Sequence, residues 1–191
     1  MKKIFSLFMI FLVLAGLFPA GAFCAPAQVI IIRHGEKPSS GNELSDQGRQ
    51  RALALVGFFR NNPAVTKFGT PMEIYAMAPK GPDGSLRAIE TVTPLARDLS
   101  LTINENFQKD DISGLVADIM HKPNYKGKMV LICWEHKIIP TIPTAFGWTS
   151  GPESWPGSEV YDRAWIMNFT DDKVTSFQDL PQHLLPGDSS R

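Results

Sequence analysis

Two histidines and two arginines of this chain fall just beyond segments that are typical of buried strands. Residues 33–36 (Arg-His-Gly-Glu) follow the apolar run 29–32, and His136 follows the apolar run 129–134. Arg87 comes after a third such run, across a loop rich in glycine and proline. An imidazole can attack phosphorus, and a guanidinium can bind two phosphate oxygens while keeping its charge. The combination therefore indicates phosphoryl-transfer chemistry.

Each of these residues, taken alone, is more often structural than functional. A single histidine after a strand usually makes a structural hydrogen bond, and a single arginine is usually a surface charge. Their joint placement favours a site, because ligands of open α/β sheets bind at the carboxyl ends of strands. A metal site on His34 and His136 is an alternative, but the neighbouring arginines would repel a cation. We therefore expect no metal and no cofactor.

The elements that must position these side chains alternate between strand and helix patterns. Short, apolar, β-branched runs alternate with segments whose apolar residues recur at helical spacing, which predicts an α/β domain. Strands are expected at residues 29–32, 73–77 and 129–134, an extended piece at 101–103, helices at 46–60, 89–99, 112–120 and 138–146, an irregular loop at 149–159, and a hairpin from 164–169 and 174–177. Ser45 and Ser85 are placed to cap the first two helices.

With these motifs the sequence resembles the histidine phosphatase superfamily, in its phosphoglycerate mutase-like branch (branch 1). The family's Arg-His-Gly-Glu signature matches residues 33–36, and its Leu-Ser-x-x-Gly-x-x-x-Ala segment matches residues 44–52. The second arginine block matches residues 87–91, and the strand followed by a histidine matches residues 130–136. The resemblance covers nearly all of the chain after residue 22. It implies a three-layer sandwich, in which helices flank a mostly parallel central sheet.

The resemblance also implies roles for individual residues. His34 would attack phosphorus and become transiently phosphorylated, while Arg33 and Arg87 would bind the phosphate oxygens. His136 would donate to these oxygens from the opposite side and stabilise the in-line transition state. Water would then hydrolyse the phosphohistidine without a metal. The expected substrate is a phosphomonoester or phosphoramidate, on a small molecule or a phosphoprotein.

The sequence departs from the family pattern around His136. Glu135 stands where a small residue is usual, Lys137 stands where a glycine is usual, and the loop before Arg87 is longer than the common form. These departures leave open a second hypothesis, a noncatalytic phosphate-binding or scaffold protein on the same fold. A mutase is a poorer hypothesis, because a cytosolic glycolytic role does not suit an exported chain.

The acid that would protonate the leaving group is not identified by the motifs. Four carboxylates are candidates by position, and each could equally be a solvated surface charge: Glu105, Asp110, Asp111 and Glu135. Glu36 and Lys37 are candidate substrate contacts. Glu36 could instead hold its loop, and Lys37 could be a solvated loop lysine.

The first 22 residues have the three-part layout of a secretory signal peptide. Lys2 and Lys3 precede an apolar run of 15 residues, and the small residues Ala20, Gly21 and Ala22 come shortly after it. The run is shorter than the roughly 20 residues that span a bilayer, which disfavours a permanent anchor. We expect cleavage near Ala22, one folded domain from residue 23 to residue 191, and a periplasmic or secreted protein.

Composition and cysteine usage limit the remaining function classes. The chain carries 19 Lys and Arg against 19 Asp and Glu, and this zero net charge argues against a nucleic-acid-binding protein. Two cysteines exclude a disulfide scaffold. Cys133 lies in a predicted strand, so we expect a buried free thiol rather than a bridge to Cys24. Lipidation of Cys24 is disfavoured because bulky Phe23 precedes it.

Overall fold

A computed structural model of the chain describes residues 24–189. The expected signal peptide and its cleavage site lie outside the described residues. Within residues 24–189, no helix combines the length and the apolar character needed to cross a membrane. The elements are β1 (Gln28–Arg33), α1 (Asp46–Asn61), α2 (Pro63–Thr66), β2 (Pro71–Ala76), α3 (Arg87–Asp98), β3 (Ile103–Asn104), α4 (Ile112–Met120), the 3-10 helix η1 (Pro123–Tyr125), β4 (Met129–Trp134), α5 (Thr141–Ala145), β5 (Arg163–Thr170) and β6 (Lys173–Pro181).

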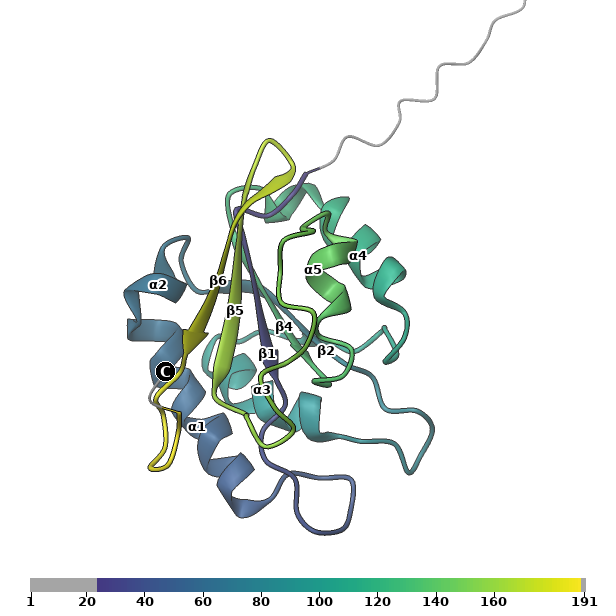
Figure 1. Cartoon of the computed structure of the whole chain (residues 1–191), viewed down its shortest axis with the longest axis vertical. Coiled ribbons are helices and arrows are strands. Elements are labelled where there is room, and N and C mark those ends of the chain that lie inside the picture. Colours follow the sequence, from purple (N-terminus) through teal and green to yellow (C-terminus); the bar gives the residue numbers. More distant parts are fainter. Residues whose placement is uncertain (1–23, 190–191) are drawn as a thin grey trace, which may run out of the picture.

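The six strands form one mixed sheet in the order β3-β2-β4-β1-β5-β6. The pairs β3–β2, β2–β4 and β4–β1 are parallel, whereas β5 runs antiparallel to both β1 and β6. Helices α1 and α3 pack together on one face, and α4 and α5 pack on the other (Figure 1). This arrangement confirms the predicted α/β sandwich with its mostly parallel central sheet.

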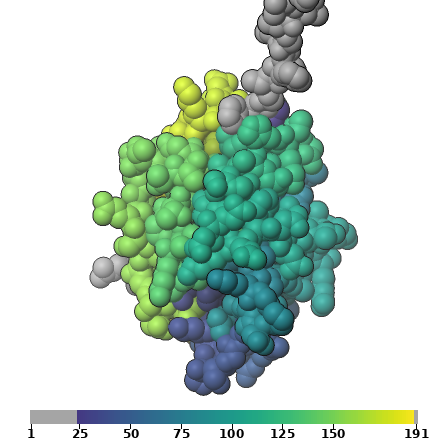
Figure 2. Space-filling view, turned by 90° about the vertical axis from the view of Figure 1, so that its right-hand side faces the viewer, coloured from purple at the N-terminus to yellow at the C-terminus, as the bar shows by residue number. Residues whose placement is uncertain are grey.

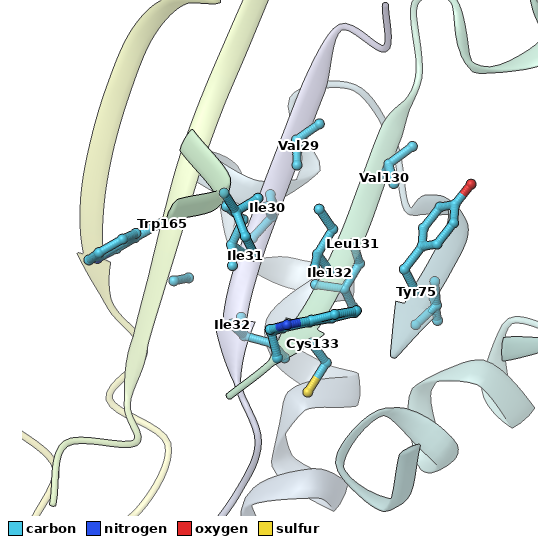
Figure 3. Close-up of a cluster of buried hydrophobic side chains, with 14 of the residues drawn as sticks. Val29, Ile30, Ile31, Ile32, Tyr75, Val130, Leu131, Ile132, Cys133 and Trp165 are labelled. Atoms are coloured by element: carbon cyan, nitrogen blue, oxygen red, sulfur yellow. The ribbon is translucent and has the colours of Figure 1, made fainter. Parts of the chain in front are cut away.

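The two central strands explain why their sequences are almost entirely apolar. Every residue of β1 and of β4 is buried, because helices cover both faces of the sheet. Side chains from β1, β2, β4 and β5 meet in one cluster, with Trp165 and Tyr75 on either side of the isoleucines of β1 and β4 (Figure 3). Cys133 belongs to this cluster, and neither it nor Cys24 forms a disulfide. The prediction of a buried free thiol is confirmed.

Of three predictions about where helices begin, one is confirmed and two are wrong. Ser45 caps α1 as predicted, since its side chain accepts from the Gly48 amide at 3.1 Å. Ser85 does not cap α3, because this helix begins at Arg87 and Leu86 occupies the capping position without a side-chain bond. The helix predicted at 138–146 is reduced to α5, and residues 136–140 form turns instead. Pro140 and Pro143 lack the amide hydrogens that a longer helix would need.

Candidate active site

The predicted site residues lie at the carboxyl ends of the parallel strands. Arg33 pairs with Trp134 across β1 and β4, and the His34 amide donates to the Trp134 carbonyl at 3.1 Å. The loops after β1, β2 and β4 therefore meet at one edge of the sheet, at the lower end of the molecule in Figure 1. Figure 2 shows the same end from the side, where blue segments following β1 lie next to teal and green segments.

His34 is buried and is held in one orientation. His34 is 4% exposed, and its Nδ1 lies 2.7 Å from the Gly35 carbonyl oxygen. A carbonyl can only accept a hydrogen bond, so Nδ1 carries the proton and the lone pair is on Nε2. Burial, together with the charges of Arg33 and Arg87, lowers the pKa of His34 to about 4. The imidazole is therefore neutral at neutral pH and can act as a nucleophile.

The loop after His34 is fixed from two sides. The Gly35 amide donates to Thr91 Oγ1 at 2.7 Å, and the Thr91 hydroxyl donates to the Arg87 carbonyl at 2.6 Å. On the other side, the first turn of α1 comes so close that a Cβ on Gly48 would lie 2.5 Å from the Glu36 carbonyl oxygen. This contact explains why the motif needs glycine at position 48.

Glu36 holds this loop through a buried ion pair. Its carboxylate accepts from Arg51 of α1, at 2.7 Å from Nη2, and Arg51 also binds Asp188 at 2.6 Å. Glu36 and Lys37 border a separate pocket of about 660 Å³, beside Arg51 and Asp188. Neither residue lines the pocket that contains His34, and Lys37 is exposed.

Arg33 is one of the largest buried side chains of the protein. Its Nη1 donates to the carbonyls of Ser158 and Val160, at 2.6 and 2.9 Å, and its guanidinium carbon lies 3.7 Å from the centre of the Tyr161 ring. Its Nε is buried and has no hydrogen-bond partner among residues 24–189. An unpaired buried donor is costly, and an anion oxygen would satisfy it.

Arg87 is the first residue of α3, and its side chain lies at the site. Its Nε donates to the Glu43 carbonyl at 2.9 Å, and its Nη2 donates to the Gly41 carbonyl. Its Nη1 lies 3.4 Å from the Oγ of Ser85, the residue that the sequence predicted to cap the helix. The loop carbonyls orient the guanidinium, and the residue lines the same pocket as His34.

This pocket has a volume of about 700 Å³ and is lined mostly by loop residues. They are His34, Met77, Ala78, Lys80, Ser85, Arg87, Gln108, Lys109, Asp110, Asp111 and Glu135. Three of the four candidate acids are therefore brought to the pocket, and the exposed Glu105 is not.

Lys80 and Lys109 were not among the candidates that the sequence suggested. They could have been considered, since each lies in a loop that follows a strand of the parallel sheet. The hydrogen bond from the Ala78 amide to the Phe107 carbonyl, at 2.9 Å, joins these two loops. Two cations outside the sequence motifs, Lys80 and Lys109, therefore line the pocket.

His136 lies beside Glu135 rather than in the pocket lining. Its Nδ1 is 3.0 Å from Glu135 Oε1, and Glu135 Oε2 is 3.2 Å from Lys109 Nζ. Burial, and then the charge of Arg33, lowers the pKa of His136. Among the described residues, no group of three or more His, Cys, Asp or Glu side chains is arranged to hold a metal ion.

Comparisons with known proteins show the fold. No family model and no curated protein matches the chain. The protein histidine phosphatase SixA in complex with tungstate is similar at a TM-score of 0.52 and 16% identity, over 81% of this chain and 97% of that one. A phosphoserine phosphatase from Entamoeba histolytica with bound 3-phosphoglyceric acid has a TM-score of 0.53 and 16% identity, over 83% and 99%.

A third solved structure has the same architecture. It is a putative alpha-ribazole-5'-P phosphatase from Escherichia coli K-12, with a TM-score of 0.50 and 10% identity, over 81% of this chain and 96% of that one. These similarities span almost the whole of each compared structure. The fold implied by the resemblance to the histidine phosphatases is confirmed.

Proposed function

We propose that this protein is a phosphatase that hydrolyses a phosphomonoester or a phosphoramidate through a phosphohistidine at His34, without a metal. The observation that carries the proposal is the state of His34. It is a buried, neutral imidazole whose proton is held at Nδ1 by the Gly35 carbonyl, in a pocket that also contains Arg87. The names of the three structural neighbours, each a phosphatase, support the same class of reaction.

In the first step, the His34 Nε2 lone pair forms a bond to phosphorus as the leaving group departs. Arg87 lies in the pocket, and the unpaired buried Nε of Arg33 offers a further donor. Fixed cationic donors stabilise the charge that is spread over the phosphoryl oxygens in the transition state. In the second step, water attacks the phosphohistidine and releases phosphate.

The test is phosphate release from p-nitrophenyl phosphate by the chain without its first 22 residues, in the presence of EDTA. We expect activity in the wild type and its loss in His34→Ala. His121→Ala is the matched control, because His121 is exposed and follows the end of α4. Full activity in His34→Ala would refute the mechanism. Phosphate binding without an acid-labile phosphoenzyme would favour the noncatalytic phosphate-binding alternative.

Export is a second part of the proposal and rests on the sequence of residues 1–22. Expression of the full chain in a bacterium, followed by fractionation and N-terminal sequencing, would test it. A protein that begins at Phe23 in the exported fraction is expected. An intact N-terminus in the cytosol would contradict this part and leave the chemistry untouched.

A further inference from the structure

Glu135 and His34 occupy equivalent positions at the ends of two neighbouring strands. Arg33, the last residue of β1, lies opposite Trp134, the last residue of β4, in this parallel pair. His34 therefore follows one strand where Glu135 follows the other. The hydrogen bond from the His34 amide to the Trp134 carbonyl keeps the two chains together at this point. Both side chains line the same pocket. A carboxylate therefore lies next to the nucleophile.

The other candidate carboxylates are less suited to act on a group bound at His34. Asp111 caps α4, and its Oδ1 accepts from the Gly114 amide at 3.1 Å. Asp110 is exposed at the rim of the pocket, and Glu105 lies outside it. The side chain of Glu135 is only 16% exposed. Of the four, Glu135 is the one enclosed beside His34.

The surroundings of Glu135 favour its ionised form. Lys109 Nζ lies 3.2 Å from Oε2. Burial opposes ionisation, but the backbone amide of Lys137 and the ammonium group of Lys109 outweigh it and hold the pKa of Glu135 below its ordinary value. An ionised carboxylate can accept a proton, but it has none to give to a leaving group.

Building on the proposed phosphohistidine, we propose that Glu135 is the general base for the water that attacks phospho-His34. The leaving group of the first step then departs without a proton from the protein. The substrates are accordingly phosphoryl compounds with weakly basic leaving groups, such as aryl phosphates, or phosphoramidates whose leaving nitrogen is already protonated.

The two steps balance as follows. First, the His34 Nε2 lone pair forms the N–P bond, and the electron pair of the breaking bond leaves with the leaving group. The Nδ1 proton stays on the ring, held by the Gly35 carbonyl. Next, the water oxygen forms a bond to phosphorus, one water proton moves to the Glu135 carboxylate, and the N–P electron pair returns to Nε2. Hydrogen phosphate leaves, and Glu135 releases its proton to solvent.

Rapid-quench kinetics with p-nitrophenyl phosphate separates the two steps. In Glu135→Gln, we expect nitrophenolate to appear in a burst of about one equivalent, with phosphoenzyme accumulating. We expect kcat to fall by about 10²- to 10⁴-fold, the usual contribution of general acid–base catalysis. Glu105→Gln, the same substitution outside the pocket, should behave as the wild type. Glu135→Asp keeps a carboxylate and tests the same step if Glu135→Gln does not fold. We expect it to slow hydrolysis of the phosphoenzyme more than phosphorylation of His34.

A series of aryl phosphates provides the second arm. Since no protein group protonates the leaving group, kcat/KM should fall steeply as leaving-group basicity rises, and equally so in the wild type and Glu135→Gln. A shallow dependence in the wild type that becomes steep in Glu135→Gln would make Glu135 the proton donor of the first step and overturn the proposal. An unchanged kcat in Glu135→Gln would also overturn it. Absence of any phosphoenzyme in both the wild type and Glu135→Gln, while phosphate is still released, would refute the proposed function itself.

Discussion

The chemistry proposed for His34 requires an imidazole that stays neutral beside two cations. Burial and the nearby Arg33 and Arg87 all disfavour the protonated ring. Arg87 also lines the pocket, so under the proposed mechanism the same guanidinium would keep the imidazole neutral and bind the phosphoryl oxygens. The Gly35 carbonyl then decides which nitrogen keeps the proton.

At the scale of this residue, we expect the His34 ring to titrate near pH 4, as the lowered pKa indicates. A histidine in the unfolded chain titrates near 6.5, so the unfolded state binds the proton first as pH falls. Folding stability should therefore decrease on acidification below pH 6.5, by about 2 kcal/mol at pH 5. NMR titration of the ring protons, assigned with His34→Ala, measures the midpoint. A midpoint near 6.5 would contradict the proposed neutral, buried nucleophile.

At the scale of elements, the start of α1 is fitted against the loop that carries His34. Gly48 is the contact point, because its Cα faces the backbone of Glu36. Gly57 lies in the same helix, is exposed, and has open space around the position of a Cβ, with its nearest neighbour at 4.0 Å. Gly48 lies in the crowded first turn of the helix, whereas Gly57 lies in its exposed interior.

We expect opposite effects from alanine at these two positions. Gly48→Ala places a methyl group 2.5 Å from the Glu36 carbonyl oxygen, so the helix or the loop must move. The free energy of unfolding should fall by about 1 to 3 kcal/mol, and the proposed phosphatase activity should fall with it. Gly57→Ala should raise stability by about 0.5 to 1 kcal/mol, since alanine favours the helix. Urea denaturation measures both, and equal effects would show that the contact at Gly48 is unimportant.

Elements were predictable from sequence wherever local patterns decide them. The apolar runs predicted β1 and β4, and Ser45 was correctly predicted to cap α1. The position of His34 directly after β1, and that of Arg87 after the loop that follows β2, were predicted from the same patterns. The pairing of Lys109 with Glu135 did not, because it depends on how the loop after β3 lies against the end of β4. No local sequence pattern encodes the distance between the Lys109 and Glu135 side chains.

At the scale of the whole molecule, a chain of buried charges joins the site loop to the C-terminal segment. Glu36 binds Arg51, Arg51 binds Asp188, and Asp188 also accepts the amides of Leu184 and Leu185. The Ser189 amide donates to Asp162, at 2.6 Å, which anchors the same segment beside β5. Segments separated by 137 residues in the sequence are therefore coupled.

This coupling predicts that Asp188→Asn will destabilise the protein by roughly 3 kcal/mol, because it leaves buried Arg51 with one carboxylate. Burial opposes ionisation of Asp188, but its bonds to Arg51 lower its pKa. Its stabilising effect is therefore complete above pH 3.8, the ordinary value, and is lost as pH falls through the lower folded value.

Urea denaturation at neutral pH measures the effect, and the difference from the wild type should shrink in acid. Asp98→Asn is the control, because its pair with Arg60 is exposed and should contribute less than about 1 kcal/mol. If Asp188→Asn and Asp98→Asn lowered the free energy of unfolding by the same small amount, Asp188 would not stabilise the site loop. A large loss for Asp188→Asn together with reduced turnover would show that the C-terminal segment supports the loop on which His34 lies.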